Sequence, residues 1–572
     1  MPPTSNPLTG NLPGLILLIL IISVPLALLT SIALLGLYRR AVIRVMRSRA
    51  PAGTPEPATP EAFPSSQEPA QTPLNIVLRN PTLDTPQNLA SERLFADLLR
   101  GPWRAVGVYT LAGLGYALVT TVIFLVATKS GFHPLNDLIL FWYYAWPIVV
   151  TVLLVAAATW RTRLTVFAIY FLIIAVLGTI SLILNSSFDW TRILLLWFFT
   201  NLPSSLLLLI FLNRRIQAVG PLVLIFMIFA VTGLVFLPPL ILFNERLIRL
   251  VAGIEVVFGL DAFGILLMLI VGSCVSFGAV GWFMLRGIGN LYQHKKISGQ
   301  SITIDAIWLL FGIFQSIDVI FEGESWFLIS LSAFVVYKIV TWVGFSILDR
   351  NAPARRKHPN LLLLRVFSLG KRSERLFDVL AMYWRYAGPI RLIAGPDLAT
   401  ATVEPHEFLE FLSGKLSRRF IDNARTLELR IAERVSEPDY DGQFRVNDFF
   451  CYDDTWRMVL SRLVGKSDVV LMDLRGFSAQ NAGCIFEIGE LINLMPLEQV
   501  LFIIDKTTDE SFLRQVMQRS WEHRKATSPN HLSKSGLLHL FRLDGLRDRE
   551  IQQLLQVLSI AANAAPKTQA FA

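Results

Sequence analysis

Long, uninterrupted apolar runs dominate the first 350 residues of the chain. The first run, Leu12–Tyr38, is longer than the roughly 20 residues that a helix needs to cross a bilayer. Further runs lie near 105–128, 138–160, 164–185, 191–212, 217–242, 261–285, 303–321 and 326–348. The pattern predicts an α-helical polytopic bundle of about nine membrane spans.

The basic residues predict how these spans are oriented. Arginines cluster between Arg39 and Arg49, after the first apolar run, whereas a signal peptide carries its charges before the run. The positive-inside rule then places the N-terminus outside and this cluster in the cytoplasm of a multi-pass cell (inner) membrane protein. Basic residues return in every second loop, so an odd number of spans leaves the C-terminal domain in the cytoplasm. We interpret Arg246–Leu260 as interfacial; if it crossed, this parity would break.

The segment between the first two spans has a different composition. Residues 51–75 are rich in Pro, Ala, Thr and Glu, which predicts a disordered or extended cytoplasmic linker. Ser91–Trp103 then has the pattern of an amphipathic helix. It either lies on the inner membrane surface or simply leads into the next span.

After a basic break at 350–360, short apolar runs alternate with amphipathic helices. The predicted strands are 361–367, 390–394, 444–451, 469–474, 500–504 and 537–541, and the predicted helices are 371–386, 405–420, 455–464, 482–494, 510–524 and 547–562. This alternation predicts a doubly wound α/β domain (flavodoxin/TIR-like) with a parallel sheet. The predicted organisation is thus a first span at 12–38, a linker at 39–100, a bundle at 101–349, a basic linker at 350–360 and a cytoplasmic domain at 361–565.

Composition agrees with a membrane protein and narrows the chemistry. The 572 residues are 53% hydrophobic and 17% charged, and the mean hydropathy is +0.52. Basic residues that flank spans explain the net charge of +9 better than a nucleic-acid partner does. Cys274, Cys451 and Cys484 are far apart and have no histidine at ligand spacing, so we predict neither a metal site nor a disulfide.

Polar and glycine-rich turns follow the predicted strands, and in an open α/β sheet such turns line one ligand crevice. The candidate ligand-binding residues are Ser368, Lys371, Arg372, Gly395, Pro396, Asp397, Asp473, Arg475 and Gly483. Asp397 or Asp473 would hold ribose hydroxyls, and Arg475, or Lys371 with Arg372, would meet phosphate. The usual dinucleotide and P-loop fingerprints are absent from the sequence.

One motif in this region resembles known families. Gly483–Gly489, GCIFEIG, is similar to the G-T-x-x-E-apolar-G motif of nucleoside 2-deoxyribosyltransferases, and Leu392–Asp397, LIAGPD, resembles their first strand and turn. Cys484–Ile488, CIFEI, also resembles the W-C-x-x-E-L motif of Toll/interleukin-receptor (TIR) domains, with Gly483 in place of the tryptophan. In both families the glutamate acts in cleavage of an N-glycosidic bond. The resemblance therefore implies that Glu487 is catalytic, with NAD or a nucleotide as substrate or ligand and no resident cofactor.

The residue chemistry is compatible with that role, because a carboxylate near the anomeric carbon stabilises or captures the oxocarbenium charge. The alternatives are an exposed glutamate or one that the helix dipole favours. Within the spans, Asp318 and Lys338 are the candidate functional charges. They form either an ion or proton relay or a structural interhelical contact.

Three functions stay open from the sequence. The first is a membrane-tethered enzyme that cleaves the N-glycosidic bond of NAD or a nucleotide, in bacterial stress or defence signalling. The second is a non-catalytic nucleotide-binding or protein-interaction signalling module, and the third is a transporter with a regulatory domain. The expected partners are the lipid bilayer and a nucleotide ligand, and the sequence leaves a homo-oligomer open.

Overall fold

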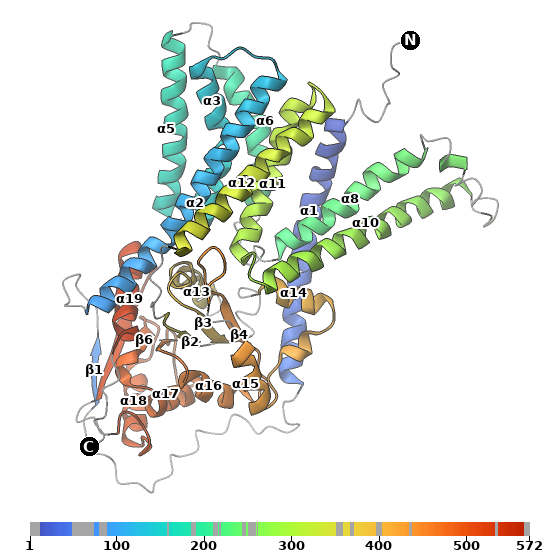
Figure 1. Ribbon diagram of the computed structural model, residues 1–572. Coiled ribbons are helices and arrows are strands. Elements are labelled where there is room, and N and C mark those ends of the chain that lie inside the picture. The colour runs from blue at the N-terminus through green and yellow to red at the C-terminus, as the bar shows by residue number, and fades with distance from the viewer. Residues whose placement is uncertain are drawn as a thin grey trace, which may run out of the picture.

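A computed structural model of the chain shows a helical bundle above an α/β domain (Figure 1). The structure describes residues 12–48, 74–78, 88–156, 160–184, 190–209, 216, 219–242, 247–249, 259, 261–350, 358–366, 371–395, 403–433, 437–531 and 536–564. The statements below concern these residues.

Seven helical segments are long and apolar enough to cross a membrane. They are Gly14–Arg47 in α1 (Leu12–Arg47), Leu89–Ala127 (α2), Pro134–Val155 (α3, Pro134–Tyr144, with α4, Trp146–Val155), Trp160–Leu184 (α5), Phe263–Gln293 in α10 (Ala262–Gln293), Gly299–Ile320 (α11) and Glu324–Arg350 (α12). Pro147 lies at the start of α4, which explains the break from α3, because proline suits the first turn of a helix but not its interior.

Two further apolar helices occupy the other predicted spans. They are α6 (Trp190–Leu209) and α8 (Gly220–Leu242), which runs beside α10 (Figure 1). The structure thus supports a membrane protein with seven candidate spans, a lower number than the nine that the hydropathy pattern predicts. Most of Arg246–Leu260, the segment with the ambiguous pattern, lies outside the described residues.

A parallel sheet of seven strands has the order β1-β7-β6-β5-β2-β3-β4, and all but β1 come from the C-terminal half of the chain. The strands are β1 (Leu74–Leu78), β2 (Leu361–Arg365), β3 (Ile390–Ile393), β4 (Val446–Phe449), β5 (Val469–Asp473), β6 (Val500–Ile504) and β7 (Gly536–Arg542). The six strands of this half follow the order 3-2-1-4-5-6, and without β4 they follow the flavodoxin-like order 2-1-3-4-5. In both orders, the direction in which successive strands are added to the sheet reverses between β2 and β5.

Apolar side chains cover both faces of the central strands, which is why these strands read as continuous apolar runs. Leu361 and Leu363 point into a core shared with α13 (Lys371–Trp384) and α19 (Asp548–Ala562). Leu362 and Leu364 point to the opposite side, into a core shared with α16 (Trp456–Val464), α17 (Ala482–Leu494) and α18 (Glu510–Glu522). The sheet is therefore buried on both faces.

The end of the predicted linker is part of this sheet. Its last residues and those that follow form β1, which pairs with β7 from Leu74↔Gly536 to Leu78↔Leu540. The prediction of an unstructured segment is thus wrong for 74–75; Arg79–Gln87 lie outside the described residues. A five-residue strand leaves little trace in a proline-rich sequence, because its stability comes from the β7 ladder.

The amphipathic segment Ser91–Trp103 does not lie flat on a membrane. It is the first part of the continuous helix α2, and Leu98 is fully buried in the core with α13 and α19. Phe95 and Leu99 pack on the same core. The second interpretation, a lead-in to the next span, is therefore correct, and its apolar face covers the α/β domain.

The segment between β3 and β4 also differs from the prediction of one helix at 405–420. α14 (Pro405–Leu412) is followed by Gly414 with φ of 70°, a left-handed conformation that ends the helix. A 3-10 turn at Leu416–Arg419 and the helix α15 (Ala424–Glu433) come next. α15 was not predicted, because four of its ten residues are charged and its apolar face is short.

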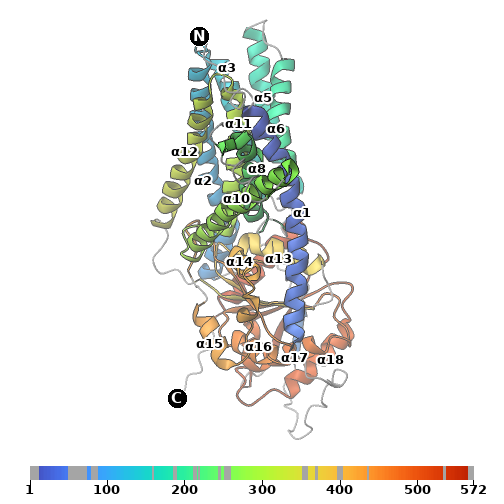
Figure 2. The same cartoon turned by 90° about the vertical axis from the view of Figure 1, so that its right-hand side faces the viewer.

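The α/β domain packs against the end of the bundle where α1, α10 and α12 finish and α2 and α11 begin (Figures 1 and 2). α1 continues past the bundle, and its Tyr38 ring meets Phe411 of α14 edge to face at 5.4 Å. The arginine-rich end of α1 thus lies beside the domain.

Candidate functional site at the carboxyl ends of β2 and β5

The reversal point of the sheet brings charged residues together. Arg365 ends β2 and stands in register with Asp473, which ends β5. The next helix after β5 is α17, and its Cys484 Sγ lies 4.0 Å from the Arg365 carbonyl oxygen. In open α/β sheets this is the position at which ligands bind.

Of the predicted site residues, the structure places Glu487, Asp473, Arg475, Gly483 and the main chain of Gly395 in this region. Ser368, Pro396 and Asp397 lie outside the described residues, as does the side chain of Lys371. Gly483 has no close neighbour, since a Cβ there would meet only the Trp456 ring, at 4.0 Å. A larger side chain at the motif's first position is therefore sterically possible.

Glu487 is a buried acid, and the alternative of an exposed glutamate is wrong. Its side chain is part of the inner face of α17, and the residue is 3% exposed. Burial raises the pKa of Glu487 to about 8, although the nearby positive charge of Arg365 offsets part of the rise. Its Oε2 atom has no hydrogen-bond partner among the described residues. A buried, unpartnered carboxyl oxygen costs free energy, which marks it as a candidate for ligand contact.

Asp473 and Arg475 bind each other. The Arg475 guanidinium donates from Nε to Oδ1 of Asp473 at 2.8 Å and from Nη2 to Oδ2 at 2.7 Å. Both side chains are at least 95% buried. Ser373 also donates to Asp473 Oδ2, at 3.5 Å. Neither partner of this bidentate pair reaches a ribose or a phosphate unless the pair opens.

Arg372 is paired as well. Its Nη2 makes a short ion pair with Asp505, which follows β6, and its carbonyl oxygen accepts from Arg475 Nη2 at 3.2 Å. Asp505, Arg365 and Ser373 were not among the predicted site residues. Asp505 could have been predicted from its place in the sequence, because it directly follows β6 just as Asp473 ends β5.

Two neighbours on α17 are structural. Cys484 is buried, and burial raises the pKa of its thiol, so it is not poised as a nucleophile. Glu490 accepts from Ser461 Oγ at 2.7 Å and thus ties α17 to α16. Within the described ranges, no three His, Cys, Asp or Glu side chains group closely enough to hold a metal ion.

The intramembrane charges have partners on other helices. Lys338 Nζ of α12 lies 2.6 Å from Oδ2 of Asp305 on α11, so the interhelical contact that we considered is present. Asp305 was not among the candidate residues. Asp318 accepts weak hydrogen bonds from the hydroxyls of Tyr143, Tyr144 and Thr200 at 3.3, 3.4 and 3.5 Å. Lys338 thus lies against a counter-charge, and Asp318 is held by three hydroxyl groups.

Comparisons with protein-family models, with curated proteins and with solved structures find no match to this chain. The function of the chain is therefore inferred from its own residues and their arrangement.

Proposed function

We propose that this chain is a nine-span membrane protein whose doubly wound cytoplasmic domain binds NAD or another nucleotide at the carboxyl ends of β2 and β5. We further propose that Glu487 cleaves the N-glycosidic bond of that ligand. The observation that carries the proposal is the buried Glu487 carboxyl with an unpartnered oxygen, one helix turn inside the reversal point of the sheet. The motif GCIFEIG, similar to two families that use this glutamate, adds to it.

The proposed topology adds α6 and α8 to the seven candidate spans, which gives an outer N-terminus and a cytoplasmic C-terminal domain. The position of the domain supports this topology. The domain lies at the end of the bundle where α10 and α12 finish, and the basic end of α1 lies beside it. The cores on both faces of the sheet support the doubly wound assignment.

In the proposed reaction, the bond between the ribose C1′ and the base nitrogen breaks, and its electron pair leaves with the base. The ionised Glu487 carboxylate stabilises or captures the positive C1′, and water then supplies the hydroxyl group. The proton of that water goes to the departing base of a nucleoside or, when neutral nicotinamide leaves, to solvent. A cationic centre next to Glu487 lowers its pKa, so ligand binding itself favours the reactive form. Burial excludes competing water from the carboxyl before the ligand arrives.

A second candidate is ligand binding without turnover, because burial raises the pKa of Glu487 to about 8 and so disfavours the carboxylate that cleavage needs. Asp473 and Arg475, which would hold ribose and phosphate, already satisfy each other. A domain that keeps this pair closed would present only Glu487 and Arg365 to a ligand.

Binding is tested first with the full chain in lipid nanodiscs and a thermal-shift panel of NAD, nucleotides and nucleosides. A ligand present at about 100 times its dissociation constant stabilises the folded state by about 2.7 kcal/mol. We expect at least one ligand to stabilise the wild type, and we expect Arg365→Met to lose this stabilisation. No shift with any member of the panel would count against both candidates.

A further inference from the structure

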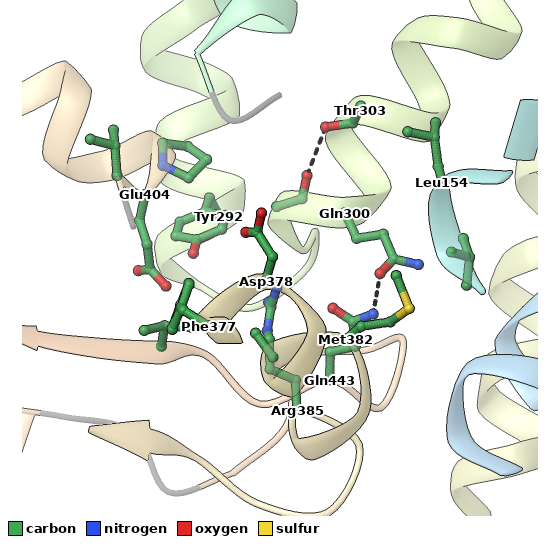
Figure 3. A pocket seen from close by; sticks show the side chains of 16 residues that line it. Leu154, Tyr292, Gln300, Thr303, Phe377, Asp378, Met382, Arg385, Glu404 and Gln443 are labelled. Atoms are coloured by element: carbon green, nitrogen blue, oxygen red, sulfur yellow. Dashed lines mark hydrogen bonds between the residues drawn. The ribbon is translucent and has the colours of Figure 1, made fainter. Parts of the chain in front are cut away.

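A cavity lies between the bundle and the α/β domain, away from Glu487 (Figure 3). Its volume is about 170 Å³, and it is partly open to solvent. The bundle contributes α4, α10 and α11, and the domain contributes α13, β4 and the start of α14. An apolar cavity of about 150 Å³ is known to hold a benzene ring. The space therefore fits a molecule with one aromatic ring.

The walls combine an apolar lining with a few polar groups, as small-molecule sites do. Val155, Phe377, Ala381, Met382 and Val446 provide the apolar part. The charged side chains of the wall are already engaged: Arg385 Nε donates to the Phe444 carbonyl at 2.8 Å, Glu404 lies 3.4 Å from His406, and Asp378 also has a partner. An uncharged ligand is thus favoured, because a charged one would have to break these contacts.

Two glutamine amides meet across the junction. Gln443 Nε2, from the domain, donates to Tyr386 at 2.7 Å and makes a short hydrogen bond to Gln300 Oε1 on α11. Among the described residues, the other atoms of the two amides, Gln443 Oε1 and Gln300 Nε2, make no hydrogen bond, although Gln443 is only 3% exposed. Turning both amides over exchanges their roles and still leaves one acceptor and one donor.

In Figure 3 the two amides face each other at the side of the cavity formed by Met382, and Asp378 points into the space beside them. Gln443 Oε1 and Gln300 Nε2 are themselves shielded from solvent. A ligand reaches them by rotation about the terminal side-chain torsions, which are soft, but this rotation breaks the hydrogen bonds from Gln443 to Gln300 and Tyr386. The ligand offsets that loss by pairing with two polar atoms that are otherwise buried and unsatisfied.

We propose that this cavity is a second ligand site, which binds a small uncharged aromatic molecule with an amide edge. The carbonyl of such an edge accepts from Gln300, its N–H donates to Gln443, and the ring packs on Phe377 and Ala381. Carboxamides and nucleobases have this chemistry. A ligand held by both walls stabilises the docked arrangement of domain and bundle. The proposal does not require cleavage at Glu487, although a base released there would belong to this class.

The test uses the full chain in nanodiscs, with benzamide and nicotinamide as probes and benzoate as the charged control. The dissociation constants are measured by ligand-observed NMR for the wild type, Glu487→Gln, Gln443→Met and Gln300→Met. We expect both amides to bind the wild type and Glu487→Gln equally. Benzoate should bind at least tenfold more weakly, and each glutamine variant should lose at least tenfold in affinity.

Equal binding of benzamide and benzoate, unchanged affinity in both glutamine variants, or no amide binding up to the solubility limit would overturn the proposal. Melting temperatures of all four proteins are recorded alongside. If Gln443→Met does not fold, Gln300→Met, at the half-buried side of the amide pair, decides. Because Glu487→Gln retains the cavity, a failure of the cleavage proposal leaves this result unaffected.

Discussion

Arg365 and Asp473 stand opposite each other in register at the ends of β2 and β5, the two strands between which the chain reverses direction across the sheet. Asp473 is paired with Arg475, and the positive charge of Arg365 offsets part of the rise that burial causes in the pKa of Glu487. The electrostatics of the site thus depend on which acid pairs with which arginine. Four predictions test this arrangement and the fold around it.

The first prediction concerns stability and pH. The pKa of Glu487 is about 8 in the folded chain and roughly 4.3 in an unfolded one, so the folded state holds an extra proton between these values. Stability therefore falls as pH rises through this window. Glu487→Gln removes the dependence and should be more stable than the wild type at about pH 8, by up to a few kcal/mol, and similar at about pH 4.5. Melting curves at both pH values check this, and identical pH profiles would contradict it.

The second prediction concerns the buried pair. Asp473→Asn leaves Arg475 as an uncompensated buried charge, which typically costs about 3–5 kcal/mol. The double variant Asp473→Leu with Arg475→Met removes both charges and should melt closer to the wild type. Arg462→Met is the matched control, because Arg462 and its partner Glu428 are 51% and 46% exposed and their pair should matter less. A single variant that melts like the wild type would show that the pair is not formed.

The third prediction tests the ion pair between Lys338 and Asp305. Lys338→Met leaves Asp305 without its partner inside the bundle and should lower the melting temperature clearly. Adding Asp305→Leu should restore much of the loss, because two apolar residues then replace the pair. If the double variant is no more stable than the single one, Lys338 and Asp305 are not paired in the folded protein.

The fourth prediction tests the strand that the N-terminal segment adds to the sheet. Asn75 and Leu537 are in register and both exposed, so cysteines at these positions should form a disulfide on mild oxidation. The control pairs Asn75→Cys with Leu538→Cys. Leu538 is fully buried on the other face of β7 and should not react. Equal cross-linking of both pairs, seen by gel mobility with and without reductant, would argue against the β1–β7 ladder.

The sequence was informative where the local pattern is strong. Val469–Met472 and Val500–Ile504 are entirely apolar, so strand prediction there was nearly complete. β1 and α15 were missed because each depends on partners far away in the chain. This dependence also means that residues 355–565 alone would lack β1 and would expose the surface that Leu98 covers, so the full chain is the right material for every test.

The candidate site was predicted in part for the same reason. The positions of Glu487, Asp473 and Arg475 follow from strand ends and a motif. Which of these residues pair with one another does not follow from the sequence, because a guanidinium can reach several carboxylates at this edge of the sheet. Burial of Glu487 likewise depends on how α17 rotates onto the sheet, which its amphipathic pattern indicates only loosely.

The most direct test of the central claim is the release of free base by the full chain in nanodiscs. NAD and a panel of nucleosides are incubated with wild type, Glu487→Gln and Glu490→Gln, and the base is quantified by chromatography. Glu490 is the matched control, since it lies one turn further along α17 and binds Ser461. We predict turnover by the wild type and Glu490→Gln, rising with pH towards the Glu487 pKa of about 8, and none by Glu487→Gln. Equal base release by wild type and Glu487→Gln, or none by any of the three, would contradict the proposed activity.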